Sequence, residues 1–325
     1  MWRLRLSLPW PGVPHGNAWA VAADGGIVLF DTGRGDPGRP RELDLALAGA
    51  GFGVEDVRLL VCTHSHADHY GLAAEITAAA GCELWMHPAW DHIREQADEP
   101  LAAFEHRAAR ARENGVPESV IEGHRRAVEA DPRNGFGPLR APDRELVDGV
   151  EVETDLGTWR ALETPGHSPS HVILHQPESG LAVTGDHLLG RVVLHFDHGN
   201  SPDPVAEYLD SLAATEQLGL ELCLAGHGRT FRDPNGKIAE TREVIATTRR
   251  RITELLAARP CTAYELLREI RGPELAAHPA TVYEISLFLA FLDTMAATGE
   301  TIPVAADGPR RWRLTAAGAA ARAVC

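Results

Sequence analysis

The feature that most constrains this chain is a group of metal-type ligands directly after a buried strand. Residues 57–62 (VRLLVC) form a short, strand-like apolar run, and the following HSHADH contains three imidazoles and one carboxylate within six residues. In a turn that leaves a strand, His64 and His66 can point to one centre, and Asp68 and His69, one bend later, can face a second. Neutral imidazole and carboxylate are ligands that zinc and similar divalent ions accept. The stretch therefore predicts a metal site at this strand end.

Three later residues strengthen this prediction. His167 in TPGH, Asp186 in VTGD and His227 in AGHG each follow a strand-like run and border a glycine-containing turn. A histidine-rich surface loop would not explain why single ligand-type residues recur at successive strand ends. Seven ligand-type residues are also more than one tetrahedral site uses, so we expect two metal ions per chain.

The order of the elements predicts an α/β architecture with an insertion. Short apolar strands alternate with helices up to about residue 87, and strands resume after residue 140. Between them, residues 88–140 have the pattern of charged, amphipathic helices broken at Asn114-Gly115, which predicts a helical lid. After residue 236 the pattern changes to long helices and a possible two-stranded wing. We expect a catalytic domain over 1–236 and a second domain over 237–325.

Taken together, THSHADH, TPGHS, TGD and AGHG, supported by DTG at residues 31–33, resemble the metallo-β-lactamase superfamily. The resemblance covers about residues 15–232. It implies an αββα sandwich with the metals at one edge of two facing sheets. The C-terminal segment is similar to the small winged-helix domain on members of the LACTB-two group, and the whole chain resembles the branch that includes glyoxalase II.

The resemblance also implies how the ligands are shared. His64, His66 and His167 would hold the first zinc ion, and Asp186 would bridge to the second, although other divalent metals would also suit these ligands. The ligands implied for the second ion are Asp68, His69 and His227. The true β-lactamases carry a thiolate where this chain has Asp186, which disfavours β-lactam hydrolysis.

The function implied is hydrolysis by a metal-bridging hydroxide, since two cations that share a water lower its pKa towards neutrality. We expect a thioester or lactone substrate, either a small molecule or an acyl-carrier substrate. Asp68 is the candidate catalytic residue: it either relays a proton to the leaving group or is a ligand alone. A phosphodiesterase or endoribonuclease is the first alternative, and a metal-dependent binding or regulatory protein is the second.

Residues around the ligands have predicted roles as well. We expect Asp31 and Thr63 either to hydrogen-bond ligand imidazoles or to make ordinary strand-end hydrogen bonds. His171 should hydrogen-bond locally. His187 and His195 should pack, although one of them could contact a substrate oxygen. Most histidines in or beside the insertion should be solvated: His87, His92, His106 and His124.

Composition limits the partners and the compartment. The chain has 325 residues with 31 Lys plus Arg against 46 Asp plus Glu, a net charge of −15, which disfavours DNA and anionic membranes. The five cysteines are widely spaced without C-x-x-C, which is typical of a cytoplasmic protein without disulfides. In the C-terminal segment, Val282, Ile285, Leu289 and Leu292 form one apolar helix face. We expect this face to pack on the catalytic domain or on a second copy, as a homodimer.

Overall fold

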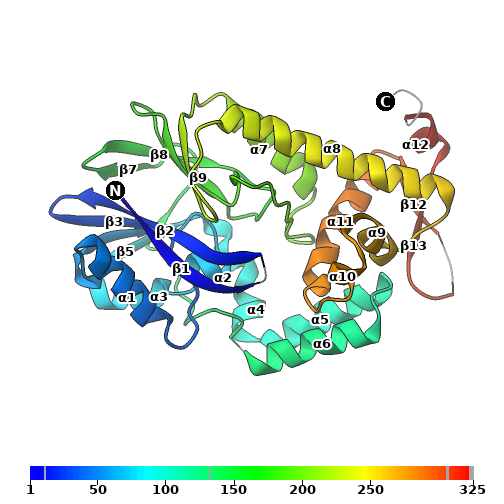
Figure 1. Ribbon diagram of the computed structural model, residues 1–325, viewed down its shortest axis with the longest axis horizontal. Coiled ribbons are helices and arrows are strands. Elements are labelled where there is room, and N and C mark those ends of the chain that lie inside the picture. Colours follow the sequence, from blue (N-terminus) through cyan, green and yellow to red (C-terminus); the bar gives the residue numbers. More distant parts are fainter. Residues whose placement is uncertain (11, 132, 305–306, 322–325) are drawn as a thin grey trace.

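Two β-sheets face each other in the computed structural model, which describes residues 1–10, 12–131, 133–304 and 307–321 (Figure 1). The six-stranded sheet has the order β1-β2-β3-β4-β5-β6, formed by β1 (Trp2–Trp10), β2 (Val13–Ala23), β3 (Gly26–Phe30), β4 (Val57–Val61), β5 (Glu83–Met86) and β6 (Arg144–Glu145). The five-stranded sheet has the order β11-β10-β9-β8-β7, formed by β7 (Glu151–Thr154), β8 (Gly157–Glu163), β9 (Val172–Gln176), β10 (Leu181–Gly185) and β11 (Leu222–Ala225).

The core between the sheets follows from the alternation of side chains along the strands. Trp19 on β2 and Phe30 on β3 point inward, towards Trp159 on β8, and the Phe30 and Trp159 ring centres are 5.5 Å apart. The alternate residues of β2 and β3 point outward, where Leu29 packs with Leu43 in a second core. Helices flank the sandwich: α1 (Arg39–Ala50), η1 (Val54–Asp56), α3 (Ala73–Ala80) and α7 (Pro204–Glu216). The predicted αββα sandwich of the α/β class is confirmed.

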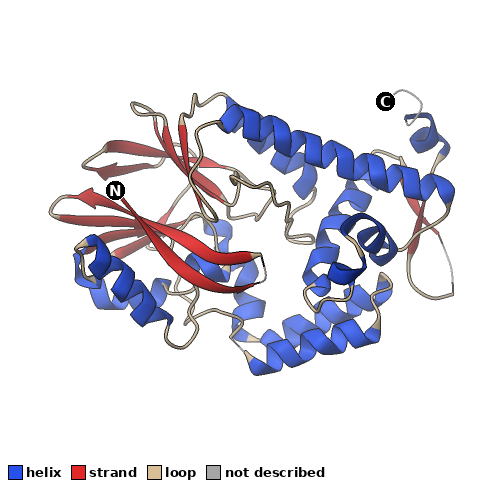
Figure 2. Ribbon diagram, viewed as in Figure 1, coloured by secondary structure: helices blue, strands red, loops and turns tan. Residues whose placement is uncertain are grey.

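Residues 88–130 form helices, as the sequence predicts for this insertion (Figure 2). The elements are η2 (Pro88–Ile93), α4 (Arg94–Asp98), α5 (Pro100–Glu113) and α6 (Glu118–Ala130). The break between α5 and α6 lies at Asn114 and Gly115, where Gly115 has a φ of +88°, a backbone conformation that favours glycine.

The C-terminal segment packs against the insertion. Its elements are α8 (Pro234–Ala258), α9 (Ala263–Arg271), α10 (Pro273–Ala276), α11 (Thr281–Ala297), β12 (Thr301–Val304), β13 (Arg311–Leu314) and α12 (Ala316–Ala321). The predicted apolar face of α11 is buried, and α11 contacts α5, α6 and α7. Phe104 of α5, Leu212 of α7 and Phe288 of α11 belong to one hydrophobic core. The apolar face is therefore covered within the chain.

The topology brings several strand ends to one edge of the sandwich. Strands β3, β4 and β5 run parallel, and so do β10 and β11, so their carboxyl ends lie together. The loops that leave β4, β8, β10 and β11 carry the predicted ligands. In the described ranges, no helix is both long and apolar enough to cross a lipid bilayer.

Candidate metal centre

The loop after β4 is shaped by Asp31, at the end of β3. Asp31 has a φ of +63°, which aspartate tolerates better than most residues, and it is buried. Its carboxylate accepts hydrogen bonds from the Thr63 backbone N–H at 2.8 Å and from the Thr63 hydroxyl at 3.0 Å. This arrangement directs His64 to the sheet edge, and α2 (Ala67–Tyr70) then begins after His66.

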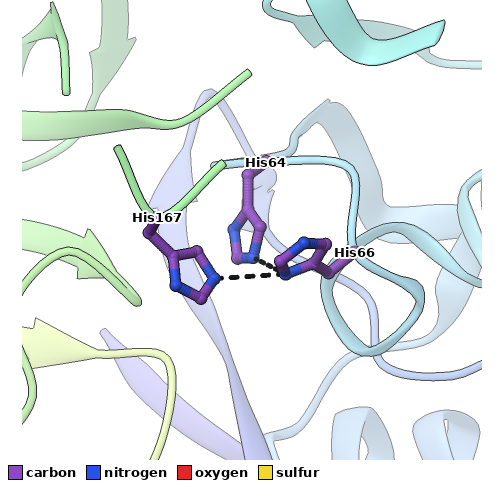
Figure 3. Close-up of side chains that lie close together, drawn as sticks. All are labelled: His64, His66 and His167. Atoms are coloured by element: carbon purple, nitrogen blue, oxygen red, sulfur yellow. Dashed lines mark hydrogen bonds between the residues drawn. The ribbon is translucent and has the colours of Figure 1, made fainter. Parts of the chain in front are cut away.

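Three imidazoles converge in what we call the first triad, composed of His64, His66 and His167 (Figure 3). The Nδ1 atom of His66 lies 3.1 Å from Nε2 of His64 and 3.1 Å from Nε2 of His167. An imidazole nitrogen has one in-plane lone pair or one hydrogen and cannot serve two such partners well. Nitrogens bound tetrahedrally at about 2.0–2.1 Å from zinc are about 3.3 Å apart, close to the observed spacing.

The second triad consists of Asp68, His69 and His227. The Oδ2 atom of Asp68 lies 3.1 Å from Nε2 of His227 and 3.4 Å from Nε2 of His69. Asp68 and His69 come from α2, whereas His227 follows β11, so two distant parts of the chain build this triad.

Asp186, directly after β10, lies between the two triads. Its Oδ2 is 3.2 Å from Nε2 of His227 and 3.8 Å from Nε2 of His167, and its Oδ1 is 3.5 Å from Nε2 of His69. The structure thus brings together all seven residues proposed as ligands, with Asp186 in contact with both triads.

Burial and mutual charge perturb the pKa values of these groups. Burial, followed by the neighbouring His66, lowers the pKa of His167 to about 3, which favours the neutral, metal-binding form. Burial also lowers the pKa of His64 well below its usual value. Burial opposes the charged form of His227 as well, but Asp186 and Asp68 raise its pKa to about 10. The carboxylates of Asp68 and Asp186 therefore concentrate negative charge beside His227, and a bound cation would neutralise it.

Two further observations show that the group of side chains suits cations. Nε2 of His69 and Oδ1 of Asp186 are buried and have no hydrogen-bond partner among the described residues. Such orphaned polar atoms are costly unless an ion or water satisfies them. In addition, a Cβ atom at Gly226 would lie 2.4 Å from Oδ1 of Asp186, so only glycine leaves room for the carboxylate. The unpaired donor atoms and the close approach of Asp186 both suit a site that binds divalent metal ions.

The ring nitrogens that face away from the triads have hydrogen-bond partners, two of which are the predicted residues Asp31 and Thr63. Nδ1 of His69 lies 2.9 Å from Oδ2 of Asp31, and Nδ1 of His64 lies 3.1 Å from the Thr63 hydroxyl. Nδ1 of His227 lies 3.2 Å from the carbonyl oxygen of His15. Partners of this kind fix the tautomer and leave Nε2 free to bind a metal. Asp31 and Thr63 thus hydrogen-bond ligand-type imidazoles, as the first interpretation predicts, and they also hydrogen-bond each other at the strand ends, as the second predicts.

Sequence reasoning missed Asp197. This carboxylate lies 2.8 Å from Nε2 of His66, and 3.3 Å each from Nε2 of His92 and Nε2 of His195. Burial opposes its charge, but His66, ahead of the hydrogen bonds from the other imidazoles, holds the pKa of Asp197 well below its usual value. Asp197 follows no strand, although it begins a turn that contains Gly199 with a φ of +95°, so the strand-end pattern that marks the other ligand-type residues is absent here.

The other histidines divide into two groups. His171 is local, as predicted: its Nδ1 lies 2.8 Å from the Thr164 hydroxyl, and its Nε2 accepts a hydrogen bond from the Asp186 backbone at 3.1 Å. His187 packs against Tyr208, also as predicted. His195 lies beside the first triad, where its ring packs 5.5 Å from the ring centre of His167, and its contact with a substrate oxygen stays a prediction.

The expectation that most insertion histidines are solvated was wrong. His106 is exposed, with 71% of its side-chain surface accessible, whereas His87 and His92 retain 12% and 10%. His124 is buried between Phe104 and Tyr283, because the C-terminal segment covers this side of α6.

Comparisons with known proteins agree with this geometry. The chain is 25% identical to a probable metallo-hydrolase, YqjP, of Bacillus subtilis over 82% of each chain. It is 30% identical to an atrochrysone carboxyl ACP thioesterase of Claviceps purpurea, over 52% of this chain and 54% of that protein. The chain thus spans about half the length of that thioesterase.

A solved structure extends the similarity to nearly the whole chain. The crystal structure of a metallo-beta-lactamase family protein from Thermus thermophilus superposes with a TM-score of 0.81 at 25% identity, covering 97% of this chain and 98% of the other. The family model of the metallo-beta-lactamase superfamily matches residues 11–227, which contain both triads and Asp186. The chain therefore belongs to the metallo-β-lactamase superfamily of metallo-hydrolases.

Proposed function

We propose that this chain is a hydrolase that binds two divalent metal ions and cleaves a thioester or lactone. Zinc is the metal that we propose for both positions. The observation that carries the proposal is the contact of Asp186 with both triads, at 3.2 Å from His227 and 3.8 Å from His167. The first triad would hold one ion, the second triad would hold the other, and Asp186 would join them. When bound, two such cations lower the pKa of a shared water and polarise a carbonyl oxygen.

Asp68 is the candidate catalytic residue. It is 6% exposed, and its Oδ2 lies 3.1 Å from Nε2 of His227 and 3.4 Å from Nε2 of His69. Either it is a ligand alone, or it also passes a proton to the leaving group. Metal content and turnover of Asp68→Asn separate these roles: full metal content with strongly reduced turnover assigns proton transfer, whereas loss of both in proportion assigns ligation.

A thioester is the preferred substrate for two reasons. A relative that is 30% identical over about half of this chain carries the name of an acyl-carrier thioesterase. The net charge of −15 also disfavours a long polyanion such as RNA, even after two divalent ions reduce it to about −11.

We further propose that residues 88–140 are a substrate lid and that residues 237–325 are a winged-helix-like domain that forms a wall of the site. In support, His92 of η2 contacts Asp197, and Arg110 of α5 donates to the His198 carbonyl at 3.0 Å, so the insertion contacts the segment beside the first triad. We also propose that the protein is cytoplasmic, that it forms a homodimer and that it binds neither DNA nor membranes.

A substrate panel tests the function. The metal-loaded protein is assayed with a thioester, a lactone, a bis(nitrophenyl) phosphodiester and short RNA, and we expect thioester or lactone turnover to dominate. Asp186→Asn should lose orders of magnitude in turnover, whereas Asp44→Asn, an exposed aspartate on α1, should not. Dominant cleavage of the phosphodiester or RNA would contradict the proposal in favour of a nuclease.

A further inference from the structure

A group of basic side chains borders the second triad. We call it the arginine cluster, and it consists of Arg3, Arg5, His15 and Arg229. In the β1–β2 hairpin, Arg5 pairs with Asn17, so these two side chains share one face of the sheet with Arg3. Asn17 on this face donates to the carbonyl oxygens of Ala225 and Gly228, at 2.8 and 3.1 Å. The basic face of the hairpin therefore lies against the loop that carries His227.

Direct contacts connect the cluster to the candidate metal centre. Nη1 of Arg3 donates to the Gly228 carbonyl at 3.2 Å, and Nη2 of Arg5 lies 3.3 Å from Nδ1 of His15. The carbonyl oxygen of the same His15 accepts the hydrogen bond from Nδ1 of His227 at 3.2 Å. One residue thus separates the Arg5 guanidinium from a proposed metal ligand.

The cluster lacks the carboxylates that usually balance arginines. Within the part of the chain that the structure describes, no carboxylate forms an ion pair with Arg3, Arg5 or Arg229. Burial and the neighbouring charges of Arg5 and Arg229 lower the pKa of Arg3. Glu42 approaches the hairpin at Ser7, but it is paired with Arg39 at 2.6 Å. Three arginines without an ion pair among the described residues thus lie beside the candidate metal centre of a chain whose net charge is −15.

We propose that the arginine cluster binds an oxyanion, a phosphate or a carboxylate, carried by the thiol half of the thioester substrate. Planar guanidinium groups bind both oxyanions through paired hydrogen bonds, and they stay charged at any physiological pH. Hydrolysis forms a C–O bond from water, breaks the C–S bond and leaves the proton on the departing thiol. The cluster takes no part in these steps: it positions the thiol half across His227 while the acyl carbon lies at the metal centre. This inference rests on the proposed thioester hydrolysis.

The kinetic test compares thiol halves of different charge with one acyl group. The substrates are acyl-pantetheine, which is neutral, acyl-phosphopantetheine, which adds a phosphate, and acyl-glutathione, which carries carboxylates. The wild-type protein should prefer one charged substrate over the neutral one, and the arm that it prefers identifies the oxyanion. In Arg3→Gln/Arg5→Gln this preference, the ratio of the kcat/KM values, should fall about tenfold or more, through KM. Arg41→Gln, an exposed arginine on α1, should keep the wild-type ratio.

A binding measurement separates this inference from the proposed function. Calorimetry with phosphopantetheine, glutathione and pantetheine should show that the wild-type protein binds one charged thiol more tightly than the neutral one. The Arg3→Gln/Arg5→Gln variant should lose that difference in affinity. The single variant Arg5→Lys, which keeps the positive charge, should retain part of it. If no thioester is hydrolysed but the arginine-dependent difference persists, the proposed function fails and the oxyanion site stands.

Two results would overturn the inference. The first is an equal preference in the wild-type protein and the double variant, with both folded as judged by their melting temperatures. The second is a double variant that loses affinity for a short RNA but keeps the wild-type affinity for every thiol, because the cluster would then bind a nucleic acid backbone.

Discussion

The hydrogen bond from His69 to Asp31 offers a sharp test of the second triad. Asp31 accepts from the Thr63 backbone through one carboxylate oxygen, and from Nδ1 of His69 at 2.9 Å through the other. In Asp31→Asn, the amide oxygen keeps the bond to Thr63, but the amide nitrogen then faces the N–H of His69. Two donors cannot pair, so His69 must move or shift its proton to Nε2, the nitrogen that faces the metal centre.

The expected magnitude follows from this geometry. A hydrogen bond to a charged group contributes about 1.5–3 kcal/mol, and loss of the partner that orients a metal-binding histidine typically lowers metal affinity about 10–100-fold. The second figure equals about 1.4–2.8 kcal/mol, so the two estimates agree. We expect the second metal ion to bind about 10–100-fold more weakly in Asp31→Asn, with the first ion little affected.

The chain offers a matched control for this substitution. Asp24 also has a positive φ, at 42°, but it is exposed in the turn between β2 and β3. Asp24→Asn makes the same chemical change in a similar backbone conformation, far from any ligand histidine. Competition with a fluorescent chelator measures both affinities. Equal affinity for the second ion in Asp31→Asn, Asp24→Asn and the wild-type protein would refute the role assigned to Asp31.

Three other predictions concern the surroundings of the site and the packing of the C-terminal segment. Asp197→Asn should lower the affinity for the first metal ion about 10–100-fold, because His66 loses its hydrogen-bond acceptor. Asp293→Asn should leave this affinity unchanged. Chelator competition measures the affinity in both variants. Burial lowers the pKa of His124 to about 4, so between pH 6.5 and 4 the unfolded chain binds more protons than the folded one. The free energy of unfolding should therefore fall by up to about 3 kcal/mol as the pH drops through this range. In His124→Phe, urea unfolding should lack this pH-dependent loss. Phe291→Ala should cost about 3–5 kcal/mol in urea unfolding, and a loss below 1 kcal/mol would show that α11 is not tightly packed.

Much of the site was predictable because its chemistry is concentrated at strand ends. The carboxyl ends of β4, β10 and β11 meet at one edge, so ligand-type residues after each strand converge. The apolar spacing on α11 likewise predicted a buried face, because an amphipathic helix must cover its apolar side. These inferences needed only local pattern and general topology.

Other parts depended on contacts that no local pattern encodes. Asp197 follows no strand, and it reaches His66 only because its irregular segment folds back over the first triad. His124 looked solvated on an amphipathic helix, but Tyr283 from a distant helix covers it. The arginine cluster forms because the antiparallel register of β1 and β2 places Arg5 on the face that meets the loop of His227.

The central claim is that two metal ions share Asp186, and metal stoichiometry tests it most directly. Elemental analysis by mass spectrometry, after gentle purification in the presence of zinc, should give two ions per chain for the wild-type protein. Asp186→Asn should give close to one under the same conditions, because the ion at the second triad loses the carboxylate that both ions share. A firm value of one ion in the wild-type protein, or of two in a variant that turns over substrate at the wild-type rate, would contradict the account.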